Sequence, residues 1–203
     1  LEAVLRNDAL GRWFQSNVAI MAIPFVDKDG VEQGDQGKGR RPHDHNRDYQ
    51  GRSIYASVRA IRRLVPLWSG GRLRIALDLH CPTIRGKSNE EIYIVGNPSD
   101  ALWTQASRLA QLLETHRKGP LPYFTASNLP FGQSWNTAEN YTGGQSFGHW
   151  AGTVKGVGLA TTFEIPYANV SGVAVTPANT RAFGRDLAEA IRRYLSARPI
   201  QQH

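Results

Sequence analysis

The stretch Leu73-Arg-Ile-Ala-Leu-Asp-Leu79, which follows Gly70-Gly71 and runs into His80, decides the fold class. A short apolar run between chain-breaking residues is typical of a strand that is buried on both faces of a sheet. Three other stretches have the same character, and they span residues 17–24, 91–95 and 158–165. The sequence therefore predicts four strands in one buried sheet.

Helices are predicted between these strands, each with a recognisable first residue. Ser53 and Ser99 precede stretches in which apolar residues recur at helical spacing. Thr176 precedes Pro177, and proline is common at the first helical position. Strands that alternate with helices predict an α/β fold, with a mixed, mostly parallel sheet covered by helices on both faces.

Length and composition suit one globular domain that spans residues 1–203. The chain has 203 residues, of which 40% are hydrophobic and 20% are charged, and its net charge is +7. The single cysteine, Cys81, excludes an internal disulfide framework and a cysteine-based zinc finger but leaves the compartment open. The longest apolar run is too short to span a membrane, and the basic residues are not interleaved with aromatic residues for base stacking. We therefore expect neither a membrane nor a nucleic acid as a partner.

The N-terminal segment is predicted to be a helix that is already in progress at the first residue. Leu1, Leu5, Trp13 and Phe14 form a roughly helical stripe, and no Ser, Thr, Asp or Asn precedes them as a cap. We therefore expect an N-terminally incomplete domain.

Three polar features fall where an α/β sheet usually places its binding site, beyond the carboxyl ends of the strands. They are the loop after the first predicted strand, His80 at the end of the second and Glu164 near the end of the fourth. Two polar loops, residues 27–51 and 119–146, are also long enough to suggest a function.

His80 and Glu164 each have a structural and a functional interpretation. His80 either hydrogen-bonds a neighbouring loop or binds a metal, since neutral imidazole is the commonest metal ligand. Glu164 lies in an apolar strand, where a carboxylate is rarely buried without a partner. It is either paired with an arginine or a general base in a poorly solvated pocket.

The segment His43-Asp-His-Asn-Arg-Asp-Tyr49 leaves three interpretations open. His43 and His45 could bind a metal if the segment is extended and both rings point the same way. Asn46 and Arg47 could clamp a carboxylate, Arg47 through its planar guanidinium and Asn46 through its amide. The third interpretation is a solvated loop.

Taken together, these motifs resemble the zinc carboxypeptidases of the M14 type, and most closely the bacterial and cytosolic-carboxypeptidase-like branch. The four motifs occur in the family's order and at approximately its spacing, over residues 17–168. They are Ile23-Pro-Phe-Val-Asp-Lys-Asp-Gly-Val31, His45-Asn-Arg-Asp48, Leu77-Asp-Leu-His80 and Thr162-Phe-Glu164. The stretch Tyr141-Thr-Gly-Gly-Gln-Ser-Phe-Gly-His-Trp150 also looks like the family's mobile loop, which carries a substrate-capping tyrosine.

The sequence departs from the family pattern at two places. Asp27-Lys28 stands where the family usually has Asn-Pro. The family's His-x-x-Glu motif, which supplies the first two zinc ligands, is absent because no histidine precedes His43. The resemblance therefore implies that these two ligands lie in a segment before Leu1, or that the metal has been lost.

The resemblance implies a zinc-dependent metallocarboxypeptidase, a hydrolase that removes the last residue from peptide or protein C-termini. In such an enzyme His80 is one ligand of Zn²⁺, and Glu164 takes a proton from the metal-activated water. The substrate's terminal carboxylate is held by Asn46 and Arg47 and covered by Tyr141. A further basic residue polarises the scissile carbonyl; we expect Arg40, with Lys38 and Arg41 as competitors.

Two other functions would use overlapping residues. One is a catalytically inactive module of the same type that binds C-terminal carboxylates, and the other is a related amidohydrolase or deacylase that keeps the zinc and Glu164. The net charge of +7 suits acidic substrates through long-range steering. The uncharged stretch Gly143–Gly148 does not support a preference for basic side chains.

Overall fold

A small mixed sheet forms the centre of the molecule in the computed structural model, which describes residues 1–35, 37–84 and 88–197. Its three strands are β1 (Ile75–His80), β3 (Leu159–Glu164) and β2 (Tyr93–Val95), in the order β1-β3-β2. β1 runs parallel to β3, and β2 runs antiparallel to it. The α/β class is therefore confirmed, but these strands do not confirm a mostly parallel sheet.

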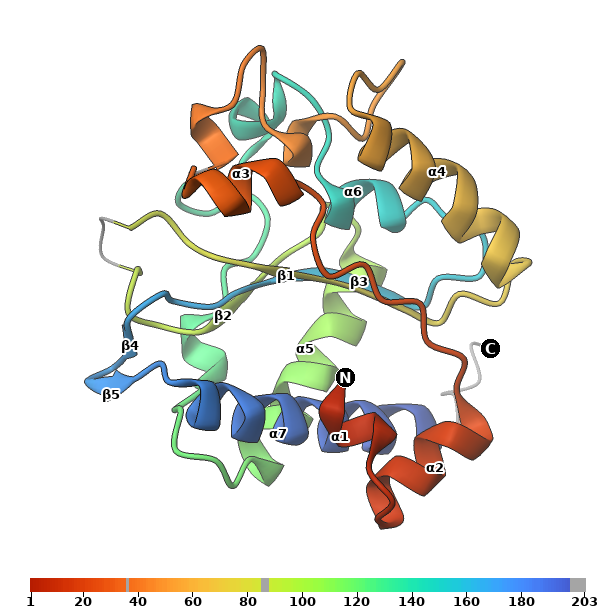
Figure 1. Ribbon diagram of the computed structural model, residues 1–203, viewed down its shortest axis with the longest axis vertical. Helices are drawn as coiled ribbons and strands as arrows, with labels where there is room; N and C mark the ends of the chain where they lie inside the picture. The colour runs from red at the N-terminus through yellow and green to blue at the C-terminus, as the bar shows by residue number, and fades with distance from the viewer. Residues whose placement is uncertain (36, 85–87, 198–203) are drawn as a thin grey trace.

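Helices cover both faces of the sheet (Figure 1). The helices α5 (Asp100–His116) and α7 (Pro177–Ser196) lie on one face, and α4 (Ala56–Ser69) and α6 (Phe147–Ala151) lie on the other. Leu159 and Phe163 of β3 are completely buried in the core beside α5 and α7, whereas Ala160 belongs to the core beside α4 and α6. This alternation follows from the two-residue period of a strand.

Two of the predicted helix starts are confirmed. The hydroxyl of Ser99 accepts a hydrogen bond from the backbone N–H of Leu102, and that of Thr176 accepts one from Asn179, with Pro177 at the first helical position. Ser53 was the wrong choice of cap, because α4 begins at Ala56 with Tyr55 before it. The buried hydroxyl of Ser53 instead donates to the carbonyl of Asp48.

The N-terminal segment begins as a helix without a side-chain cap, as predicted, but it is two helices and not one. α1 (Glu2–Leu5) ends at Arg6, and α2 (Ala9–Asn17) begins after Asp8, whose carboxylate accepts a 3.0 Å hydrogen bond from Gly11 N–H. An aspartate cap inside the predicted helix starts a second one because it satisfies an otherwise free N–H group. Leu10 and Phe14 of α2 pack against Ala188 of α7.

The strand predicted over residues 17–24 does not form. Asn17 is the last residue of α2, and residues 18–23 have no regular secondary structure and no ladder partner within the described part of the chain. Ile20 and Ile23 keep 44% and 43% of their surface exposed. Apolar residues favour burial, but a strand also needs a neighbouring strand to satisfy its backbone groups.

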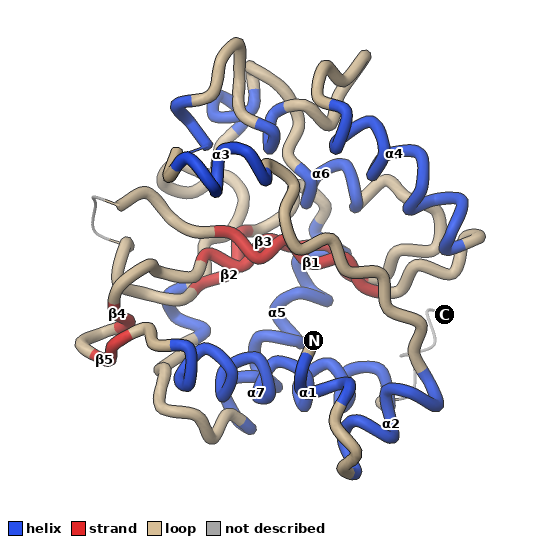
Figure 2. The backbone as a smooth tube through the Cα atoms, in the orientation of Figure 1, coloured by secondary structure: helices blue, strands red, loops and turns tan. Residues whose placement is uncertain are grey.

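The two long loops contain short helices and are not structureless. The first holds α3 (Lys28–Gln33), η1 (Gly37–Gly39) and η2 (His45–Arg47), and the second holds η3 (Thr125–Ser127) and η4 (Ala138–Tyr141). A hairpin of β4 (Asn169–Val170) and β5 (Val173–Ala174) follows the central sheet. Figure 2 shows much of the irregular chain on the side of the sheet that carries α3 and α6. None of the described helices combines the length and the apolar character needed to cross a membrane.

Candidate functional site

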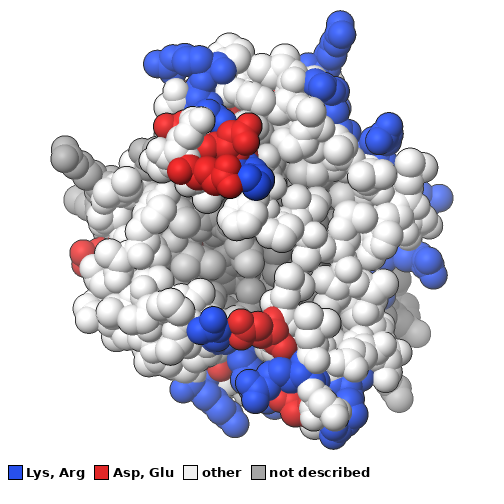
Figure 3. Space-filling model, in the orientation of Figure 1, with Lys and Arg blue, Asp and Glu red and all other residues white. Residues whose placement is uncertain are grey.

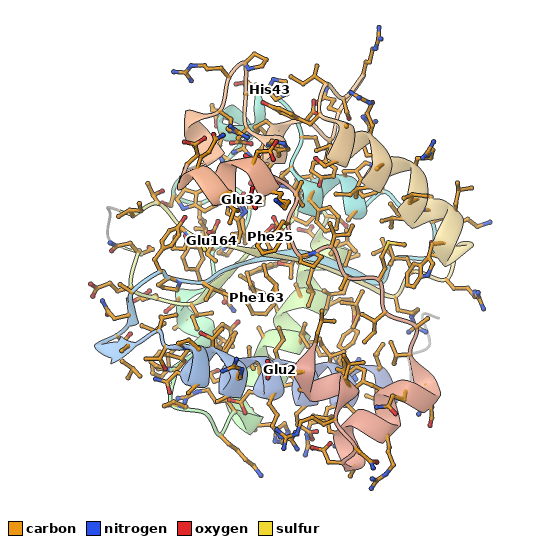
Figure 4. The ribbon with its side chains drawn as sticks, in the orientation of Figure 1. Glu2, Phe25, Glu32, His43, Phe163 and Glu164 are labelled. Carbon is orange, nitrogen blue, oxygen red and sulfur yellow. The ribbon has the colours of Figure 1, made fainter. Side chains whose placement is uncertain are left out.

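His80 and Glu164 lie next to each other at the carboxyl ends of the parallel strands β1 and β3. The two residues are paired in register, and so are Asp78 and Thr162, two positions earlier. Because side chains alternate along a strand, all four point to the same face of the sheet. Figure 4 shows Glu164 between the sheet and α3, whereas Phe163 lies on the opposite side of the sheet. The residues expected to bind metal and to move protons are thus brought together.

Asp78 controls the protonation of His80. The carboxylate oxygen Oδ2 of Asp78 lies 3.7 Å from Nδ1 of His80. Partial burial alone would lower the pKa of His80, but the negative charges of Asp78 and Glu164 outweigh it and raise the pKa to about 9. Without a metal the imidazole therefore carries a proton at neutral pH, and a metal ion must displace that proton to bind.

Asn46 joins the first loop to the sheet and to α6. Its amide nitrogen donates to Asp78 Oδ2 at 3.1 Å, and its amide oxygen accepts from the backbone N–H of Phe147 at 2.7 Å. These bonds hold η2 beside the ends of β1 and α6. They leave one N–H and one lone pair of the amide for a ligand.

Arg47 and Tyr141 form a contact pair beside the sheet. The guanidinium of Arg47 lies 4.9 Å from the centre of the Tyr141 ring and donates to the carbonyls of Asn46 (2.8 Å) and Asn140 (3.2 Å). An open pocket of about 290 Å³ adjoins it. The residues that line this pocket are Arg40, Arg41, Pro42, His43, Asp44, Arg47 and Asn140. The two residues expected to hold and cover a carboxylate therefore contact each other, next to a pocket rich in arginine.

Arg40 is held by two carboxylates. Nε and one terminal nitrogen contact Asp27 at 2.7 and 2.6 Å, and the other terminal nitrogen contacts Asp35 at 3.1 Å. Burial alone would raise the pKa of Asp27, but the hydrogen bonds from Arg40 and from Gly30 N–H hold it below its usual value. Arg41 has an exposed side chain on the same pocket, and the side chain of Lys38 lies outside the described residues.

The departure at Asp27-Lys28 has a structural explanation. Asp27 caps α3, because its carboxylate accepts a 3.0 Å hydrogen bond from Gly30 N–H while it also binds Arg40. The loop therefore enters a helix where the family pattern has a turn.

His43 and His45 both contact the ring of Tyr55, but their ring nitrogens face different carboxylates. Nε2 of His43 lies 3.0 Å from the buried carboxylate of Asp48. His45 stacks on Tyr55 at 3.7 Å between ring centres and lies 3.5 Å from Asp27, and burial lowers its pKa. Within the described ranges, no group of three His, Cys, Asp or Glu residues is arranged to hold a metal ion.

Sequence reasoning missed three residues that shape this site. Asp78, which contacts both His80 and Asn46, could have been found from its place two residues before His80 on the same strand face. Asn136 and His149, which contact Tyr141, gave no such signal, because they lie in the same stretch of loops and short helices as Tyr141, where no regular side-chain period pairs residues at these separations.

Comparison with known proteins adds no assignment. No protein-family model matches the chain, and no curated protein matches it. The family resemblance therefore depends on the four motifs and on the geometry that brings their residues together.

Proposed function

We propose that this chain belongs to a zinc-dependent metallocarboxypeptidase. One observation carries the proposal: His80 and Glu164 end two adjacent parallel strands, in register and on one face of the sheet. Tyr141, which contacts Arg47, lies within electrostatic reach of Glu164. Burial raises the pKa of Tyr141, and the charge of Glu164 adds to this effect.

The side chains at the strand ends fit one part of a zinc site. A catalytic zinc is held by three protein ligands, and His80 supplies one nitrogen, with the carboxylate of Asp78 behind it to orient the ring. The described residues offer no complete ligand set, so the proposal requires two more ligands from elsewhere, such as a His-x-x-Glu motif. Zinc, when bound, polarises a carbonyl and makes a bound water acidic.

Glu164 is the general base of the proposed reaction. It has only 6% of its surface exposed and lies beside His80, at the strand end where a peptide bond would be presented. Its carboxylate takes the proton of the attacking water and passes it to the leaving amine. His80 and Glu164 therefore have separate roles, one toward the metal and one toward the proton.

Arg47 and Asn46 make the enzyme an exopeptidase. Arg47 lines the pocket and pairs with the terminal carboxylate of the substrate, while the remaining N–H of Asn46 donates to it. Holding this end fixes which peptide bond lies at the strand ends. Tyr141 covers the bound end.

The contacts of Arg40 change which residue of the first loop we propose to polarise the scissile carbonyl. Arg40 was the residue expected, but Asp27 and Asp35 compete with a substrate oxygen for its three nitrogens. Arg41, on the same pocket and exposed, becomes the stronger candidate.

The proposal is tested by Arg47→Ala in the complete protein, with exposed Arg63→Ala as the matched control. Losing one side of a charge-assisted pair costs about 2 kcal/mol or more, so kcat/KM for peptides with a free C-terminus should fall about 30-fold or more. C-terminally amidated peptides should be affected little, and Arg63→Ala should change neither. An equal loss for free and amidated peptides would rule out the clamp.

The same assay separates the two other functions. An inactive module would bind free-carboxylate peptides without cutting them. A deacylase would cleave N-acyl amino acids faster than peptides. Release of the C-terminal residue from free peptides alone supports the carboxypeptidase.

A further inference from the structure

A column of aromatic rings connects the Arg47–Tyr141 pair to α6. The ring of His149, which lies on α6, is 4.1 Å from that of Tyr141, at 43° to it. Phe131 contacts the other end of the column, 6.0 Å from His149 in an edge-to-face arrangement. Contacts of this kind stabilise a ring beyond the area that they bury.

The hydroxyl of Tyr141 is fixed by a rigid partner. It donates to the amide oxygen of Asn136 at 2.9 Å. Asn136 is completely buried, and its amide nitrogen donates to the carbonyls of Gly96 (2.9 Å) and Leu129 (3.3 Å). With the hydroxyl fixed, the tilt of the Tyr141 ring depends on the groups beside it, which include Arg47 and His149.

His149 is itself held firmly against the strand that ends in Glu164. Its backbone N–H donates to the hydroxyl of Ser146, which caps α6. A Cβ at Gly148 would lie only 3.1 Å from the Thr162 hydroxyl, so α6 sits directly on β3. The position of His149 is therefore fixed relative to β3, the strand that carries Glu164.

The imidazole of His149 contributes its ring and no visible hydrogen bond. Its Nε2 is buried and has no hydrogen-bond partner within the described chain. Burial, helped by the positive charge of Arg47, lowers the pKa of His149 to about 4. At neutral pH a neutral ring therefore stands beside the cation, where a charged one would be repelled.

We infer that His149 is a positioning residue, which holds Tyr141 against Arg47 and sets the distance of this pair from Glu164. Its role in substrate binding rests on the proposed function, whereas its hold on Tyr141 does not. Because His149 acts through the contact of its ring with Tyr141, a phenylalanine at this position should hold Tyr141 in the same way.

The test compares His149→Ala and His149→Phe in chain labelled with 3-fluorotyrosine, and His116→Ala at the end of α5 is the matched control. The ¹⁹F resonance of Tyr141, assigned by its loss in Tyr141→Phe, should shift and broaden in His149→Ala. It should return close to its wild-type position in His149→Phe and stay unchanged in His116→Ala. A Tyr141 resonance that is the same in His149→Ala as in wild type would overturn the inference.

Peptide binding separates this inference from the proposed function. Calorimetry with an N-acetyl dipeptide, as free acid and as amide, should show about tenfold weaker binding of the acid by His149→Ala and recovery in His149→Phe. Failure of the wild-type chain to prefer the acid would count against the proposed function and leave the hold on Tyr141 standing. Unchanged acid binding by a His149→Ala variant in which Tyr141 has moved would overturn the positioning role.

Discussion

His80 and His149 lie close to one strand, β3, and yet take opposite protonation states. The pKa of His149 is lowered to about 4 by burial and by the charge of Arg47. The pKa of His80 is raised to about 9, because Asp78 and Glu164 outweigh the effect of burial. At neutral pH one imidazole is therefore neutral within a column of rings, and the other carries a proton that a metal would replace.

Titration of His149 should make stability depend on pH. The usual histidine pKa is 6.5, so between pH 6.5 and about 4 the unfolded chain binds a proton that the native chain does not. The free energy of unfolding should therefore fall as the pH drops through this window.

Urea unfolding of the wild type and of His149→Phe at pH 4, 5, 6 and 7 measures this contribution. The other titrating groups are common to both chains, so the difference between the two curves isolates His149. The two curves should diverge as the pH falls. Parallel curves over this range would show that His149 titrates normally in the native state.

At the scale of elements, the approach of the second loop to the first depends on Gly144. It has φ of +140°, and a Cβ there would lie 1.9 Å from the carbonyl oxygen of Arg47. Only glycine adopts this conformation readily and leaves room for that close approach. Its neighbour Gly143 has no atom within 4 Å of a Cβ placed on it.

Gly144→Ala and Gly143→Ala form a matched pair. Gly144→Ala should push the loop away from η2, weaken binding of free-carboxylate peptides at least tenfold and lower the free energy of unfolding by about 1–3 kcal/mol. Gly143→Ala should change neither quantity appreciably. Calorimetry and urea unfolding measure both, and equal behaviour of the two variants would contradict this packing of the loops.

Local signals predicted the elements whose ends are fixed by nearby residues. Ser99 and Thr176 begin α5 and α7 as expected, and the apolar runs before His80 and Glu164 form β1 and β3. The run over residues 17–24 misled us because a strand depends on a partner, which the composition of one segment does not reveal. The helix α3 was missed although Asp27 caps it and Gly34, with φ of +72°, ends it.

At the scale of the whole molecule, strand topology accounts for the part of the site that was predictable. His80 and Glu164 were expected beyond the carboxyl ends of strands of one sheet, and the pairing of β1 with β3 brings them side by side. The residues that surround Arg47 and Tyr141 were not predictable. Asn140 reaches Arg47 only after two distant loops pack together. Asn136 and His149 contact Tyr141 within a stretch of loops and short helices that has no regular side-chain period.

The charges are distributed unevenly, and this limits what the net charge of the chain says about its substrates. The net charge of +7 favours acidic substrates at long range. Yet acidic side chains gather over α3 on the face in Figure 3, and the surface is hollowed below them, toward the sheet. Arginines instead line the pocket next to Arg47. Attraction of an anion is therefore a local property of that pocket and does not extend over the whole surface.

Zinc binding by the whole chain tests whether its described residues form a complete metal site. The 203-residue chain alone should bind zinc weakly, since one imidazole does not make a closed site. In a titration against a chelating dye, His80→Ala should remove what little binding there is. Tight stoichiometric binding that survives His80→Ala and disappears in His43→Ala would place the metal at the first loop instead.

The central claim, that Glu164 is the general base of a zinc peptidase, is tested most directly by Glu164→Gln in the complete protein. Glutamine keeps the shape of the buried side chain but cannot take a proton from water. Activity, zinc content and melting temperature are measured on the same sample. We predict a fall in turnover of about two to four orders of magnitude, with zinc content unchanged and folding nearly intact. Normal turnover in a folded, zinc-loaded Glu164→Gln variant would contradict the mechanism.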